Sequence, residues 1–126
     1  MTIALNHTIV AARDKRESAQ FLTELFGLPD PVDAGYFVMV ELANGVSLDY
    51  ADAPEFNPQH YAFLVSEDEF TAIYAKIVGR GLEHWGDPGQ RTPGQINTHD
   101  GGRGVYFTDP SGHYLEIITR PYGSGS

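Results

Sequence analysis

The hydrophobic positions of this chain form short apolar runs and helical stripes in an order that occurs twice. Residues 5–11 and 60–65 are apolar runs that predict strands. Each is followed by a stretch with apolar residues at helical spacing, from about residue 15 to 26 and again from 67 to 78. Both stretches end at glycines, which commonly terminate helices. The pattern therefore predicts a strand and then a helix in each half of the chain.

The first helix has recognisable start and stop signals. Asp14 can cap its N-terminus, and Glu17 lies in the first turn, where the helix dipole favours a negative charge. The helix is expected to stop at Gly27 and Pro29. Its apolar stripe consists of Ala19, Phe21, Leu22, Leu25 and Phe26.

Further strands are predicted after each helix, since apolar runs bounded by turn residues follow. In the first half, a turn at residues 43–45 separates the last two predicted strands. In the second half, a D-P-S-G turn separates the last two predicted strands. The predicted strands are residues 31–35, 36–42 and 46–51, then, beyond a variable segment at 82–94 and a glycine-rich loop, residues 105–108 and 113–119.

The two halves can be superimposed on each other as a repeat. Aligning the last strands on their glycines pairs Asp49 with Glu116, and aligning the first strands pairs His7 with His60. The two alignments need different offsets, so the second copy has a longer middle. The predicted fold class is α+β, with two βαβββ modules that form a curved mixed sheet around a metal-containing cavity.

The repeat places one imidazole and one carboxylate in each module. Two histidines with one or two carboxylates form the ligand set of a divalent metal that keeps open positions for chemistry. Glu116 lies between Leu115 and Ile117, and a buried, unpaired charge there would cost several kcal/mol that coordination removes. One histidine on a strand is more often a structural residue than a metal ligand. The argument for a metal therefore rests on the repeated pattern of His7, His60, Asp49 and Glu116.

Length and charge narrow the possible functions. The length predicts one domain at residues 1–122, with modules at about 4–52 and 59–120 and a flexible tail at 123–126. The formal net charge of −9 disfavours a nucleic-acid partner. There is no cysteine, which excludes disulfides and thiolate metal sites. No leader or membrane-spanning run is present, so we expect a cytoplasmic protein.

These features carry a family resemblance. The βαβββ order, the histidine that opens each module and the closing run V-Y-F-T-D-P-S-G-H-Y-L-E-I resemble the vicinal oxygen chelate superfamily. That superfamily includes glyoxalase I, extradiol dioxygenases, fosfomycin-modifying enzymes, methylmalonyl-CoA epimerase and bleomycin-binding proteins. The resemblance covers residues 5–121. It implies modules that pair within or between chains, and from it we expect a homodimer.

The resemblance also implies roles for individual residues. His7, His60 and Glu116 match positions that bind metal in nearly all metal-dependent members. Asp49 matches a ligand glutamate of glyoxalase I but is one methylene shorter, so it is either a fourth ligand or a base near the metal. The expected cofactor is a divalent transition metal: Fe²⁺, Zn²⁺, Ni²⁺, Co²⁺ or Mn²⁺. Three ligands would suit ferrous iron and O₂ activation, whereas four would suit isomerisation. Asp49 and Glu116 are the predicted catalytic carboxylates, because a carboxylate that leaves the metal could transfer a proton.

Other polar residues are weaker candidates. His99 and Arg103 lie in a glycine-rich loop, where they either bind a substrate or belong to a solvated turn. His84 and Trp85 form either a pocket wall or a core patch. Strand alternation directs His113 away from Glu116, so we expect it to be structural.

The resulting functional hypothesis is a metal-dependent enzyme that chelates a small oxygen-rich substrate through two oxygens. Its reaction would be that of a lyase, an isomerase or a ring-cleaving dioxygenase. The alternative is a metal-free protein that sequesters a small molecule or an antibiotic, as bleomycin-resistance proteins do.

Overall fold

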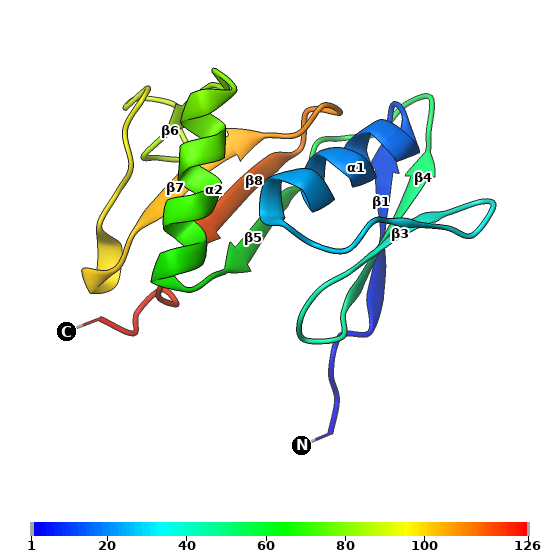
Figure 1. Cartoon of the computed structure of the whole chain (residues 1–126), viewed down its shortest axis with the longest axis horizontal. Helices are drawn as coiled ribbons and strands as arrows, with labels where there is room; N and C mark the ends of the chain where they lie inside the picture. Colours follow the sequence, from blue (N-terminus) through cyan, green and yellow to red (C-terminus); the bar gives the residue numbers. More distant parts are fainter. Residues whose placement is uncertain (1, 126) are drawn as a thin grey trace. The chain divides into compact units, whose positions relative to one another are not determined.

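A computed structural model describes residues 2–125 of the chain. Met1 and Ser126, the outer ends of the predicted domain and of the predicted tail, lie outside the described residues. The chain divides into two compact units, Met1–Asn57 and Pro58–Ser126, and each unit is described by itself. Each one contains a helix packed on a four-stranded mixed sheet, which confirms the predicted α+β class with two βαβββ modules (Figure 1).

The first unit forms a sheet in the order β1-β4-β3-β2, in which β1 and β4 are parallel and the other pairs are antiparallel. Helix α1 packs against β1, β3 and β4. Only two residues of the strand predicted at 31–35 pair with a neighbour. The elements are β1 (His7–Ala12), α1 (Lys15–Phe26), β2 (Val32–Asp33), β3 (Val38–Glu41) and β4 (Ser47–Asp52).

The predicted ends of α1 are confirmed. The Asp14 carboxylate accepts hydrogen bonds from the backbone N–H groups of Arg16 and Glu17, at 3.0 and 3.1 Å. Gly27 ends the helix with a left-handed φ of 67°, which glycine adopts without steric cost. The buried face is shifted from the predicted stripe, because Phe21 and Phe26 are only half-buried. Its buried residues are Ser18, Ala19, Leu22, Thr23 and Leu25.

The second unit repeats this arrangement with the sheet order β5-β8-β7-β6, and β5 is parallel to β8. Helix α2 lies across one face of this sheet (Figure 1). The sequence prediction missed β6, a two-residue strand that carries His84 and Trp85. The elements are β5 (His60–Leu64), α2 (Glu67–Gly79), β6 (His84–Trp85), the 3₁₀ helix η1 (His99–Gly101), β7 (Gly104–Thr108) and β8 (Tyr114–Ile118).

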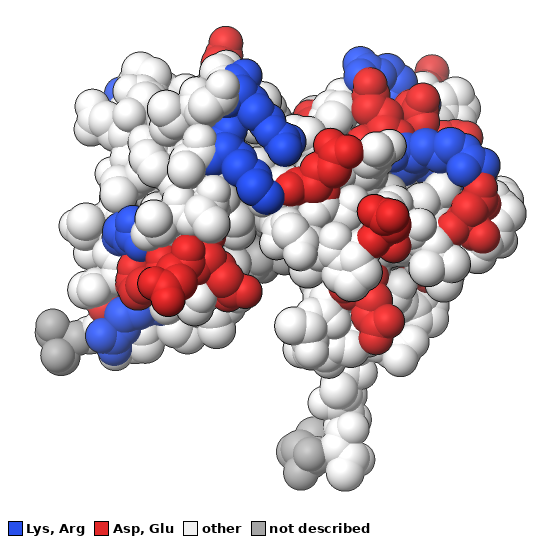
Figure 2. All heavy atoms as spheres, in the orientation of Figure 1, with Lys and Arg blue, Asp and Glu red and all other residues white. Residues whose placement is uncertain are grey.

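Helix α2 begins at a capping box. The Ser66 hydroxyl accepts from the Glu69 backbone, and the Glu69 carboxylate accepts from the Ser66 backbone. The acidic side chains of the first turn gather on the face seen in Figure 2, at the lower end of the helix, where they complement the helix dipole. Gly79 is the last residue of the helix and Arg80 is its C-cap, which confirms the predicted end at a glycine.

The register of the two sheets confirms the predicted repeat. His7 lies opposite Ser47 on β4, and His60 lies opposite Tyr114 on β8. Two residues further along these strands stand Asp49 in the first unit and Glu116 in the second. In each unit the histidine therefore lies on the strand next to the one that carries the carboxylate, and it pairs with the residue two positions before that carboxylate. Both side chains lie on the same face of the sheet.

That shared face is the one opposite the helix in each unit. The helix-covered faces hold buried apolar side chains, such as Val38 and Tyr50 in the first unit and Val105 and Ile117 in the second. The opposite faces carry exposed apolar side chains next to the histidines. No helix among residues 2–125 is long and apolar enough to cross a membrane.

Candidate metal centre

Glu116 is the most deeply buried acidic side chain of the second unit, with 0% of the residue exposed. It stands in the middle of β8, on the face away from α2, where Tyr106 of β7 lies opposite it. One oxygen, Oε1, lies 3.0 Å from His60 Nε2, and the other accepts a hydrogen bond from the Tyr122 hydroxyl. A carboxylate removed from water needs such partners, because an unpaired buried charge costs several kcal/mol.

His60 opens β5 and presents a defined ring nitrogen to Glu116. Its Nδ1 lies 3.1 Å from the backbone carbonyl oxygen of Tyr114. A carbonyl oxygen only accepts, so Nδ1 carries a proton, and in neutral imidazole Nε2 then holds a lone pair. This lone pair is directed at a carboxylate oxygen, and only a proton or a cation can bridge two such groups. The His60–Glu116 donor set therefore fits a divalent metal ion, and the Tyr114 carbonyl orients the ring as a supporting residue of a metal ligand does.

Two tyrosines complete this site. Tyr122 donates to Glu116, and the Tyr106 hydroxyl lies 2.8 Å from the Tyr122 hydroxyl. Burial and the hydrogen bond to Glu116 raise the pKa of Tyr122, and burial also raises the pKa of Tyr106. The Tyr106 ring stacks on His60, with centroids 6.0 Å apart and planes 26° apart. Both phenols thus remain neutral hydrogen-bond donors at ordinary pH.

The same side chains line a cavity of about 340 Å³ within the second unit. Its wall is mostly aromatic and apolar, with His60 and Glu116 as the groups able to bind a metal. A cavity of this kind suits a small organic ligand whose polar atoms meet a few fixed groups. The lining residues are His60, Pro88, Tyr106, Tyr114, Glu116 and Tyr122.

The first unit holds the other two predicted ligands at the corresponding register. His7 is exposed at the start of β1, and its Nδ1 lies 2.7 Å from Asn6 Oδ1. Asp49 is buried on β4, and its Oδ1 accepts a 2.6 Å hydrogen bond from Ser47 Oγ. One carboxylate oxygen of Asp49 is thus occupied by a neighbour on its own strand.

Of the four predicted ligands, the structure brings His60 and Glu116 into contact. Within residues 2–125, His, Asp and Glu side chains form no group of three or more that could hold a metal ion. His7 and Asp49 belong to the other unit, so their part in a common site with His60 and Glu116 stays a prediction from the repeat.

Arg103 and His99, the predicted substrate-binding residues, lie elsewhere. The Arg103 guanidinium donates to Glu67 Oε1 and Thr71 Oγ1, each at 2.8 Å, and lies 4.4 Å from the centre of the Phe70 ring. It therefore joins the start of β7 to helix α2, on the helix-covered face of the sheet. His99 is exposed in η1. Substrate binding by either residue stays a prediction without a supporting contact.

His113 is buried and structural, as strand alternation predicts. The ring Nδ1 of His113 accepts a 2.9 Å hydrogen bond from the Gln59 backbone N–H, and the backbone N–H of His113 donates to Asp109 Oδ1 at 2.8 Å. The ring also meets Tyr61 edge-on. These contacts connect the turn before β8 to the start of β5, which fixes where His60 begins its strand.

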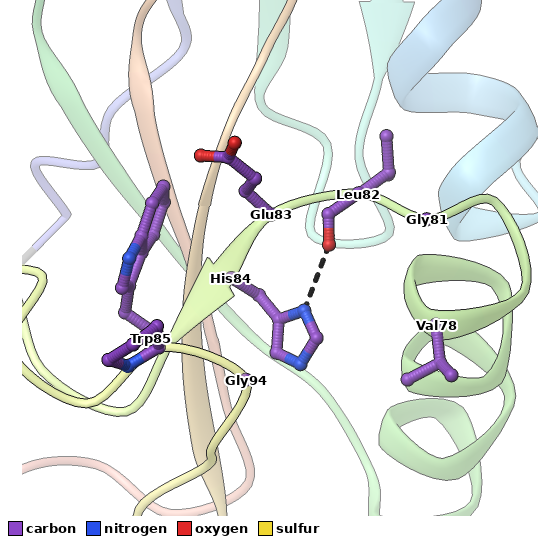
Figure 3. A pocket seen from close by; sticks show the side chains of 8 residues that line it. Val78, Gly81, Leu82, Glu83, His84, Trp85 and Gly94 are labelled. Carbon is purple, nitrogen blue, oxygen red and sulfur yellow. Dashed lines mark hydrogen bonds between the residues drawn. The ribbon is translucent and has the colours of Figure 1, made fainter.

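His84 and Trp85 line a different cavity from the one at Glu116. This second cavity has a volume of about 570 Å³ and lies between β6, the loop at Gly94 and the last turn of α2 (Figure 3). The His84 ring points toward the helix that carries Val78, while its Nδ1 is hydrogen-bonded to the Leu82 carbonyl at 2.9 Å. Neither residue contributes to the His60–Glu116 site.

Sequence reasoning missed both tyrosines of the site. Tyr106 could have been found, because it alternates with the buried Val105 and Phe107 and so shares the face of Glu116. Tyr122 has no such signal, since it follows β8 in a turn and its orientation depends on the folded C-terminus.

The fold and the His–Glu pair define a class of proteins built from paired βαβββ modules. The family model for the Glyoxalase/Bleomycin resistance protein/Dioxygenase superfamily matches residues 4–117. The chain belongs to this superfamily, which confirms the resemblance that the sequence motifs carry.

Individual relatives agree with the family assignment. The solved structure of a protein called Oxidase ChaP-H2 is 59% identical, with a TM-score of 0.96 and complete coverage of both chains. Oxidase ChaP-H1 is 55% identical, with a TM-score of 0.94 and coverage of 97% of this chain and 99% of that one. A glutathione transferase, FosA of Serratia marcescens, is 31% identical over 93% of this chain and 81% of its own length.

Proposed function

We propose that this protein is a metal-dependent oxidase that acts on a small oxygen-rich organic substrate. The observation that carries the proposal is the contact between His60 Nε2 and Glu116 Oε1, two metal-ligand groups that face each other at 3.0 Å in an aromatic cavity. The high identity to two proteins named oxidases supports oxidation over isomerisation.

The proposed ligands are His60 and Glu116 together with His7, which occupies the equivalent register position in the repeated module. Two histidines and one carboxylate form the facial set that suits ferrous iron, so Fe²⁺ is the metal we propose among those considered. When bound, such a metal offers open positions for two substrate oxygens and can activate O₂.

The chain's own residues would orient the substrate and handle protons. The cavity wall of Tyr106, Tyr114 and Pro88 would hold the carbon skeleton, since it presents mostly apolar surface. The hydroxyl groups of Tyr122 and Tyr106 would hold the carboxylate in place, because Tyr122 donates to Glu116 and Tyr106 donates to Tyr122. Asp49 is proposed as the base that accepts a substrate proton, since its remaining carboxylate oxygen is not engaged by Ser47.

Metal analysis tests the proposal directly. Protein purified without chelators, and protein reconstituted with Fe²⁺ under nitrogen, should bind close to one metal ion per chain. His60→Ala and Glu116→Gln should each lose this ion, while His99→Ala should retain it. The Fe²⁺ protein should then consume O₂ with some members of a panel of catechols and other vicinal oxygen compounds.

The outcomes separate the enzyme from a sequestering protein. Binding of an organic ligand with no metal, even after reconstitution, would contradict the proposal and favour the sequestering alternative. Metal binding without O₂ consumption but with isomerisation of a test substrate would contradict the oxidase part alone.

A further inference from the structure

The C-terminal segment after β8 folds back so that Tyr122 reaches the buried carboxylate of Glu116. We propose that Tyr122 is a positioning residue for Glu116, held in place by a C-terminal turn that is anchored on Asp100. This inference rests on the proposed function, because it assigns Tyr122 a role toward the metal that Glu116 would bind.

Three hydrogen bonds between side chains and backbone groups hold the turn. The Asp100 carboxylate accepts from the backbone N–H groups of Gly123 and Gly125, at 3.1 and 3.2 Å. The Arg120 guanidinium donates to the Ser124 carbonyl at 3.1 Å. The segment predicted to be a flexible tail therefore has its own contacts with η1, on either side of Ser124.

Asp100 itself has a backbone suited to this anchoring. Its φ is 58°, a left-handed conformation that aspartate adopts more readily than most residues. The backbone of Gly125 passes so close to Asp100 that a Cβ atom on Gly125 would come within 2.2 Å of Asp100 Cα. Only glycine fits this approach, so the path of the tail is sterically defined.

The consequence for Glu116 is that its two oxygens have different partners. Oε2 accepts from the Tyr122 hydroxyl, while Oε1 faces His60 Nε2. The Tyr106 hydroxyl, 2.8 Å from that of Tyr122, directs the Tyr122 proton toward the carboxylate by donating its own. Glu116 would therefore present a single oxygen to a metal shared with His60, and the tyrosine would prevent it from binding through both oxygens.

A purely structural role does not account for Tyr122. The residue is 54% exposed, so it contributes little to the core, whereas its hydroxyl reaches a carboxylate that is fully buried. The contact thus serves the carboxylate more than the packing of the tail. Hydrogen-bond partners that orient a metal ligand typically change metal affinity by roughly 10- to 100-fold when removed.

Cobalt binding tests this inference without turnover. The full chain is titrated with Co²⁺ while the visible d–d absorption is recorded, for the wild type, Tyr122→Phe and Asp100→Gly, the last chosen because glycine accepts the left-handed backbone. Tyr36→Phe is the matched control, since Tyr36 is exposed in the first unit.

Tyr122→Phe should weaken Co²⁺ binding about 10- to 100-fold and lower the absorption per cobalt, as a second carboxylate oxygen raises the coordination number. Asp100→Gly should change both quantities in the same direction by less, and Tyr36→Phe should change neither.

A second measurement is independent of any metal. The imidazole ¹⁵N signals of His60 in the metal-free protein, at fixed pH, should shift in Tyr122→Phe and not in Tyr36→Phe. Equal thermal melting of all variants would show that they fold. Wild-type cobalt affinity and spectrum in Tyr122→Phe, or an unchanged His60 signal, would overturn the inference. Failure of the wild type to bind any divalent metal would instead contradict the proposed function, and the His60 signal would then decide the role of Tyr122.

Discussion

His60 Nε2 lies 3.0 Å from Glu116 Oε1, although half of the His60 side chain is exposed and only 1% of the Glu116 side chain is. The sheet register produces this relationship. His60 pairs with Tyr114, and Glu116 is the next residue along β8 on the same face. A histidine at the surface thus connects a buried carboxylate to a cavity, as the proposed metal site requires.

Replacement of Glu116 should separate function from stability. We expect Glu116→Leu to abolish metal binding and to leave the melting temperature unchanged or raised, because an apolar side chain of similar volume needs no partners in this place. Calorimetry and metal analysis on the same samples check this. A melting temperature that falls by ten degrees or more would instead mark Glu116 as a structural residue.

Replacements of Asp49 and of His7 should differ in their effect on metal affinity. We predict that Asp49→Asn keeps metal affinity within a few-fold of wild type, because the shorter carboxylate is already hydrogen-bonded to Ser47 Oγ. His7→Ala should lose tight binding, since it would remove one of three strong ligands. Isothermal titration with Fe²⁺ or Co²⁺ distinguishes the two. Equal losses in both variants would instead identify Asp49 as a fourth ligand.

Phe70 should be a major contributor to the stability of the second unit. Its side chain is 0% exposed, and the Arg103 guanidinium packs on its ring. We expect Phe70→Ala to lower the free energy of unfolding by about 3–5 kcal/mol through lost burial and the resulting cavity. Urea unfolding at pH 7 measures the loss, and the exposed Val78→Ala on the same helix is the control, with a change of about 0.5 kcal/mol or less.

The contact between Glu67 and Arg103 should contribute to stability in a pH-dependent way. Hydrogen bonds from Thr119 and from Arg103 lower the pKa of the Glu67 carboxyl below its ordinary value of 4.5. A lowered carboxyl pKa stabilises the folded state at pH values above the ordinary pKa. This stabilisation is lost as the pH falls through the folded-state pKa. The difference in unfolding free energy between wild type and Glu67→Gln should therefore be present at pH 7, shrink below pH 4.5 and vanish below the folded-state pKa of Glu67. A difference that grows toward acid pH would reverse the sign of the predicted pKa shift.

Assembly is the last prediction. Each unit has one sheet face without a helix, and this face carries exposed apolar side chains such as Ile9 and Leu64, which are 58% and 63% exposed. Exposed apolar surface of this kind favours association. We predict a homodimer, and sedimentation at micromolar concentration should give twice the mass of the chain. A monomer under these conditions would contradict the prediction.

Local patterns were sufficient to predict most of the fold. The cap at Asp14, the stop at Gly27 and the helical spacing in α2 are signals that lie within a few residues of the structure they specify. Strand alternation is a property of the backbone, so the sequence also shows which residues of one strand share a face, such as Tyr114 and Glu116. That His60 lies on the face of Glu116 follows from the pairing of β5 with β8. The strand β6 escaped prediction because its two residues lie in the variable segment at 82–94, where no longer run of strand-like residues surrounds them.

What the sequence by itself determined, then, is the order of elements, the repeat and the residues that share a face within each strand. Only the tertiary structure decided which partners these groups have. Arg103 turned out to bind helix α2, and Tyr122 turned out to bind Glu116 through a turn held by Asp100. Both contacts join residues whose separation follows no helical or strand period. Their formation depends on how the folded chain brings distant segments together, and this information is absent from any local pattern.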